Sequence, residues 1–224
     1  MNPELSHHLP EIKFCGLTRP EDAEFAAELD ADYAGVIFAG GPRLLTLDRA
    51  MEVLAGVSRL KRVGVFGDQS TDEITKAADW AQLAVVQLHG ETTAERIEAI
   101  RHDFPGEIWA VCRVAGSSVP PSVEDAFALA DRVLLDAYVP GALGGTGTTI
   151  PWAEIRGQVQ GLRDRRKKPL VLAGGLRPEN VSVAISALGP DVVDVSSGVE
   201  SAPGIKDHAR MRAFRDAVRA SIPT

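Results

Sequence analysis

A cysteine and a lysine share the end of the first predicted strand, within the sequence IKFCG. Because side chains alternate between the two faces of a strand, Lys13 and Cys15 should face the opposite way from Ile12 and Phe14. A cation about 7 Å away favours a thiolate, so we expect Lys13 and the amides of the following helix start to lower the pKa of Cys15 below its usual ~8.5. Cys15 is therefore a candidate base. The alternative is a small buried hydrophobic residue.

Two aspartates stand at the ends of later predicted strands. Alternation turns Asp136 inward with Leu134, and it turns Asp194 inward with Ser196. A thiol and a carboxyl group that face each other across a pocket can act as base and acid, so Asp136 is a candidate proton donor. The alternative role of Asp136 is that of a turn residue or loop cap.

An arginine and a histidine follow other strands. Arg43 comes after Gly40, Gly41 and Pro42, in a loop where packing needs no arginine. Its planar fork could bind a carboxylate, and the alternative is a solvated surface charge. His89 could line the pocket or cap the end of the fourth strand.

Small residues follow the seventh and eighth predicted strands, in the sequences LAGGL and VSSGVE. Exposed amides there, and a short helix that could begin at 197–200, favour an anion, and barrels often bind phosphate at this place. Tight turning alone is the alternative. The GGTG sequence at 144–147 is either a ligand contact or a hinge. Because no glycine pair follows the fourth strand, we expect one phosphate and not two. The candidate phosphate-binding residues are Gly145, Gly147, Gly174, Gly175, Ser196, Ser197 and Gly198.

Apolar runs of strand length alternate with segments of helical period, and this pattern repeats eight times. Continuous runs of Val, Leu and Ile indicate strands buried on both faces, as in a parallel sheet covered by helices. The pattern predicts an α/β fold, a single-domain (β/α)8 TIM barrel, whose active site lies in the loops after the strands. An open doubly wound sheet is the alternative, but no G-x-G-x-x-G follows the first strand. The predicted strands are 12–15, 33–38, 62–66, 84–88, 108–114, 132–135, 170–173 and 192–195, and the predicted helices include 20–29, 71–81, 94–104 and 178–187.

Three S/T-x-x-E sequences follow the first, third and fourth predicted strands. Each has the residues of a capping box, in which two side chains satisfy free amides at a helix start. The predicted pairs are Thr18 with Glu21, Ser70 with Glu73, and Thr92 with Glu95.

The composition of the 224-residue chain, 45% hydrophobic and 25% charged, is that of a globular protein with ample material for a core. A net charge of −7 disfavours nucleic acid and anionic membranes as partners. Two cysteines are too few for a disulfide framework or a zinc site, and no export signal is recognised, so we expect a cytoplasmic protein without a metal. We expect a leader at 1–10, a catalytic barrel domain at 11–224, and either a monomer or a homodimer.

Seven groups of residues in register resemble the phosphoribosylanthranilate isomerase family, from about Ile12 to about Lys206. They are IKFCGLT, GPR, VGVF, VQLHGE, LLDA with GGTG, LAGGLRPENV, and DVSSGVE with GIKD. The resemblance implies an Amadori rearrangement of N-(5-phosphoribosyl)anthranilate, a small phosphorylated substrate, without cofactor or metal. It implies that Cys15 is the general base and Asp136 the general acid. It also implies that Arg43 binds the anthranilate carboxylate, and that His89 and Asp194 help to shape the substrate site.

Two other functions remain open from the sequence. A histidine-pathway or dual-substrate isomerase performs the same rearrangement on a ligand with two phosphates, but such enzymes resemble half-barrel duplications and use aspartate where Cys15 stands. The other is a barrel without catalytic activity that acts as a binding partner. The presence together of Lys13, Cys15, Arg43 and Asp136 disfavours that possibility.

Overall fold

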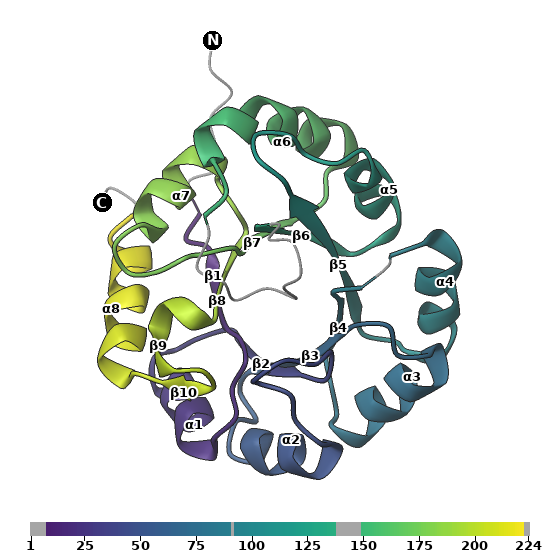
Figure 1. Ribbon diagram of the computed structural model, residues 1–224, viewed down its shortest axis with the longest axis vertical. Coiled ribbons are helices and arrows are strands. Elements are labelled where there is room, and N and C mark those ends of the chain that lie inside the picture. Colours follow the sequence, from purple (N-terminus) through teal and green to yellow (C-terminus); the bar gives the residue numbers. More distant parts are fainter. Residues whose placement is uncertain (1–7, 91, 138–148, 222–224) are drawn as a thin grey trace.

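Eight parallel strands form a closed barrel at the centre of the molecule, and helices surround it (Figure 1). The computed structural model describes residues 8–90, 92–137 and 149–221. The barrel strands are β1 (Glu11–Phe14), β2 (Tyr33–Ile37), β3 (Lys61–Phe66), β4 (Val85–Leu88), β5 (Glu107–Val114), β6 (Arg132–Ala137), β7 (Leu170–Leu172) and β8 (Val192–Val195). The helices are α1 (Pro20–Glu28), α2 (Leu47–Leu54), α3 (Thr71–Trp80), α4 (Ala94–Asp103), α5 (Ser122–Leu129), α6 (Trp152–Arg166), α7 (Val181–Leu188) and α8 (His208–Arg219).

The closed barrel confirms the predicted fold class. Each strand pairs with its sequence neighbour, and β8 pairs with β1 in register, which places Asp194 opposite Lys13. The predicted and observed strands agree to within two residues at their ends. Helix α7 begins at Val181 rather than Pro178, because the Asn180 side chain accepts a hydrogen bond from the Arg177 amide in a turn that precedes the helix.

Two apolar layers lie on the two sides of the strands. Inward-facing residues such as Val63, Trp109 and Val171 form one cluster within the barrel. Outward-facing residues such as Phe14 and Val86 pack with the helices in a second, larger cluster. Burial on both faces accounts for the nearly continuous apolar sequence of the strands.

One of the three predicted capping boxes is confirmed. The Ser70 hydroxyl accepts from the Glu73 amide while the Glu73 carboxylate accepts from the Ser70 amide. The prediction for Thr92 is wrong by one residue, because Thr93 is the N-cap of α4.

The predicted pair of Thr18 with Glu21 is also wrong. Arg19 is the N-cap of α1 and makes no side-chain cap, whereas the Thr18 hydroxyl donates to the carbonyl of Gly204. The local sequence predicted that this hydroxyl would cap α1, but it is used in a contact with a distant part of the chain.

A short hairpin follows the eighth strand, and the eight-unit pattern did not predict it. The 3₁₀ helix η1 (Ser197–Val199) occupies the place of the predicted short helix. It is followed by antiparallel strands β9 (Glu200–Ala202) and β10 (Ile205–Lys206), beside α1 and α8 (Figure 1).

An ion-pair cluster closes the end of the barrel at which the strands begin. Arg132 lies 2.8 Å from a Glu11 oxygen and 2.9 Å from a Glu107 oxygen. Within the described residues, no helix is long and apolar enough to cross a membrane.

Candidate active site

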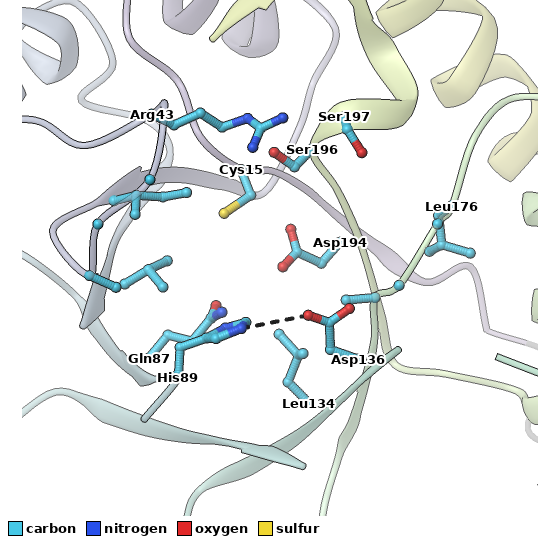
Figure 2. Close-up of a pocket in the computed structure, with 18 of the residues that line it drawn as sticks. Cys15, Arg43, Gln87, His89, Leu134, Asp136, Leu176, Asp194, Ser196 and Ser197 are labelled. Carbon is cyan, nitrogen blue, oxygen red and sulfur yellow. Dashed lines mark ion pairs between the residues drawn. The ribbon is translucent and has the colours of Figure 1, made fainter. Parts of the chain in front are cut away.

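A cavity of about 370 Å³ opens at the end of the barrel where the strands finish, a volume suited to a small molecule. Figure 2 shows Cys15, Asp136 and Asp194 around it, with Arg43 near Ser196. Nine predicted site residues line it together: Cys15, Arg43, His89, Asp136, Gly174, Gly175, Asp194, Ser196 and Ser197.

Lys13 and Cys15 face the barrel interior, as strand alternation predicted. Their side chains lie over the same residue of β2, because a Cβ atom added to Gly35 would come 3.1 Å from Cys15 Sγ and 3.2 Å from Lys13 Cε. Lys13 is fully buried, and its Nζ donates to Asp194 Oδ2 at 2.7 Å. The lysine is therefore shared between the thiol and a carboxylate on β8.

The prediction for the pKa of Cys15 is wrong in direction. Burial raises this pKa above its usual value, and the lowering effect of Lys13 is smaller. The carboxylate of Asp194 also raises it, since a second negative charge nearby disfavours the thiolate. The sequence showed the lysine but not the carboxylate that faces it.

Asp136 is buried at the end of β6, and the desolvation of its carboxyl group raises its pKa to about 6. The amide of Ala137 donates to Oδ1 at 2.8 Å and opposes this shift, whereas the charge of Asp194 adds to it. His89 Nε2 lies 3.7 Å from the other oxygen, Oδ2 (Figure 2). Asp136 can therefore hold a proton near neutral pH.

Arg43 is buried, which rules out the alternative of a solvated surface charge. Its Nε and Nη2 donate to the two carboxylate oxygens of Glu200, at 2.8 and 2.6 Å. The side chain crosses closely over Gly16, where a Cβ atom would lie 2.5 Å from Arg43 Cδ and the backbone φ is +67°. Glycine at this position leaves room for the arginine.

The two glycine-rich loops lie side by side, since a Cβ atom on Gly198 would clash with the carbonyl of Leu176. The amides of Gly175, Ser197 and Gly198 have no acceptor among the described residues. Gly198 does not line the cavity itself, and its close contact with Leu176 explains the need for glycine. The other two candidates, Gly145 and Gly147, lie outside the described residues.

Sequence reasoning missed three polar residues of this region. Gln87 lines the cavity, and its buried Oε1 has no hydrogen-bond partner in the described structure. Strand alternation with His89 could have identified it. Glu200 and Lys206 are buried beside the cavity, and no local signal marks them because their place depends on the β9–β10 hairpin.

Residues 8–90, 92–137 and 149–221 contain no group of three or more His, Cys, Asp or Glu side chains that could hold a metal ion.

Comparison with known proteins identifies the family. The model of N-(5′-phosphoribosyl)anthranilate (PRA) isomerase matches residues 12–217. The enzyme of that name from Pseudomonas fluorescens is 43% identical over 209 residues, which cover 92% of this chain and 97% of the relative. The one from Paramagnetospirillum magneticum is 39% identical over 218 residues, which cover 95% and 99%.

Solved structures agree. Phosphoribosyl anthranilate isomerase from Thermotoga maritima has a TM-score of 0.82 at 34% identity, over 94% of this chain and 99% of that one. A phosphoribosyl anthranilate isomerase in complex with reduced 1-(o-carboxyphenylamino)-1-deoxyribulose 5-phosphate has a TM-score of 0.79 at 32% identity, over 94% and 99%.

A thiol, a carboxyl group and a guanidinium group at the mouth of a (β/α)8 barrel define a barrel enzyme. The chain belongs to the N-(5′-phosphoribosyl)anthranilate isomerase family. Its reaction converts PRA to 1-(2-carboxyphenylamino)-1-deoxyribulose 5-phosphate, CdRP, in tryptophan biosynthesis. The resemblance noted in the sequence is thus confirmed.

Proposed function

We propose that Asp136 is the general acid of this isomerase and that Cys15 is its general base. The observation that carries this assignment is that both side chains line one cavity, from strands on different sides of the barrel. A pKa of about 6 supports the role of Asp136, since a donor works best when its pKa is near the working pH.

The reaction needs two proton transfers at different atoms. Asp136 gives its proton to the furanose ring oxygen, the C1–O bond breaks, and the nitrogen lone pair forms a cationic iminium at C1. The Cys15 thiolate then removes the proton from C2, and the C–H electron pair forms the C1–C2 double bond of the enolamine. Tautomerisation to the ketone completes the rearrangement.

The raised pKa of Cys15 fits this order of events. Burial disfavours the thiolate in the empty cavity. Ring opening places a positive charge next to the thiol, and a nearby cation favours the thiolate. The minor form of the enzyme that holds Cys15 as the thiolate is therefore stabilised when the iminium forms, after Asp136 has acted.

Arg43 is proposed to bind the anthranilate carboxylate. Glu200 accepts hydrogen bonds from Nε and Nη2 of Arg43, and Nη1 of Arg43 donates to none of the described residues. The outer edge of the guanidinium is thus available for a second carboxylate, in the two-pronged geometry that arginine favours.

The phosphate group is proposed to bind the glycine-rich loops after β7 and β8. Support comes from the amides of Gly175, Ser197 and Gly198, which have no acceptor among the described residues and suit the oxygens of an anion. His89 and Asp194 are proposed to shape the site between the phosphate and the anthranilate ring. The proposal keeps Gly145 and Gly147 as further phosphate contacts.

A kinetic isotope effect tests the two roles separately. PRA with deuterium at ribose C2 reports on the step assigned to Cys15. In C15S this step should become rate-limiting, so the isotope effect on kcat should increase above that of the wild type. In D136N ring opening should limit the rate, so the isotope effect should approach unity. The opposite pattern would mean that the two assignments are exchanged.

We also propose the setting of the enzyme. Two free, buried cysteines suit the cytoplasm, where disulfides are rare. The proposed domain bounds remain a leader at 1–10 and a barrel domain at 11–224. We propose either a monomer or a homodimer, and the dimeric enzyme from Thermotoga maritima supports the second. Light scattering of the purified protein will decide between the two oligomeric states.

A further inference from the structure

A cluster of three buried charges stands behind the carboxylate-binding edge of Arg43. Glu200 lies between two cations, with Arg43 Nη2 at 2.6 Å and Lys206 Nζ at 2.7 Å from its oxygens. All three residues are less than 10% exposed. The cluster carries a net charge of +1, so it can accept one further anion.

Lys206 fixes the carboxylate of Glu200 to the rest of the site. Its Nζ also donates to the carbonyl of Cys15 at 2.6 Å and to the carbonyl of Ser196 at 3.2 Å. The strand end that carries the thiol and the start of the glycine-rich loop thus share one ammonium with Glu200. Movement of the Glu200 carboxylate would cost this shared hydrogen bond.

The hairpin that supplies Glu200 and Lys206 is itself attached to the first helix. The Thr18 hydroxyl donates to Gly204 in the turn of the hairpin. The Lys206 amide donates to the buried carboxylate of Asp22 at 3.2 Å, and Arg19 donates to the Lys206 carbonyl at 3.3 Å. The position of Glu200 therefore does not depend on the hairpin turn alone.

Three buried charges are costly unless each has a close partner of the opposite sign. Apolar side chains could fill the space beneath the β9–β10 hairpin as well as an ion cluster does. A bidentate pair fixes both the place and the plane of a guanidinium group. The arrangement is therefore suited to orienting Arg43.

We propose that Glu200 is a positioning residue of the isomerase, which holds the guanidinium of Arg43 in the plane and direction needed to receive the anthranilate carboxylate. The inference rests on the carboxylate-binding role proposed above for Arg43. It gives the β9–β10 hairpin a function in substrate selection.

The variant Glu200→Gln tests the proposal with little change in volume. It keeps one acceptor oxygen but turns an NH₂ group toward Arg43, so the bidentate pair is lost. We expect KM for PRA to rise about 10- to 100-fold, as for the loss of a hydrogen bond between charged groups, with kcat within about threefold of the wild type.

Two ligands separate positioning from a general structural role. One is reduced CdRP, the compound bound in the solved relative, and the other is its phenylamino counterpart without the carboxylate. Calorimetry on the wild type should show a strong preference for the carboxylated ligand. E200Q should lose most of this preference while its affinity for the phenylamino ligand stays the same. R43A should lose the preference too, and R43A/E200Q should lose no more than R43A.

Glu11→Gln is the matched control, because it removes a carboxylate from an arginine pair at the opposite end of the barrel. The control should keep the full preference. If R43A loses the preference and E200Q keeps it, the inference about Glu200 is wrong while the role of Arg43 stands. If R43A itself keeps the preference, the proposed role of Arg43 fails. Should E200Q not fold, Glu200→Asp, whose side chain is one methylene shorter and holds its carboxylate away from the guanidinium, should give the same loss.

Discussion

Lys13 Nζ lies 2.7 Å from Asp194 Oδ2 inside the barrel, and both groups are almost completely shielded from water. The pair joins the first strand to the last one at the point where the barrel closes. The Asp194 carboxylate also offsets the positive charge of Lys13, which lowers the pKa of Cys15.

Removal of one member of this pair should be costly, because it leaves the other charge buried without a partner. We expect Lys13→Met to lower the free energy of unfolding by ~3–5 kcal/mol. Adding Asp194→Asn should recover part of this loss. Urea denaturation of the two single variants and the double variant measures the coupling, and purely additive losses would contradict the assignment of a coupled pair.

Loss of either proton-transfer group should affect turnover far more than binding. Cys15→Ser and Asp136→Asn should each lower kcat by ~10²-fold or more, while the KM for PRA changes little. The loss of anthranilate fluorescence during turnover provides the assay, with the histidine-pathway substrate measured in parallel. A C15S enzyme with nearly normal kcat would show that another group is the base.

The pH dependence of kcat/KM should have two limbs that belong to the acid and base as a pair. Activity needs protonated Asp136 and ionised Cys15, yet burial holds the pKa of Asp136 at about 6 and raises that of Cys15. The active form is then a minor protonation state, whose population is constant between the two pKa values. We expect activity to fall below pH ~6 and again above ~8.5.

Asp136→Asn provides the check on these limbs. Without the titrating acid, the residual activity should depend only on the thiolate, so it should rise through the alkaline pKa instead of falling. A wild-type profile that already falls between pH 7 and 8.5 would indicate that Lys13 outweighs burial at Cys15.

Inorganic phosphate should inhibit competitively by binding to the amides of the glycine-rich loops after β7 and β8. Ser197→Asp places a negative charge in this anion site, so it should raise the KM for PRA by ~10-fold or more and weaken the inhibition by phosphate. Ser186→Asp, on the exposed side of α7, adds the same charge far from the site and should change neither quantity. Uncompetitive inhibition, or equal effects of the two variants, would place the phosphate elsewhere.

Most of the fold could be predicted because its signals are local. Continuous apolar runs identified the eight strands. Strand alternation correctly turned Cys15, Asp136 and Asp194 toward one cavity, since that rule needs only the position of each residue in its strand. Ser70 with Glu73 formed its capping box for the same reason, because both partners lie within one helical turn.

The tertiary structure decided which groups are partners and which charges are buried. Thr18 contacts Gly204, Lys13 contacts Asp194, and Arg43 contacts Glu200, each across more than 150 residues of sequence. Electrostatic energy depends on the distance between the charged groups and on their shielding from water. Both are set only when the barrel closes. The sequence by itself therefore determined the barrel and the residues that face its mouth, whereas only the folded structure decided the direction of the Cys15 pKa shift and the orientation of Arg43.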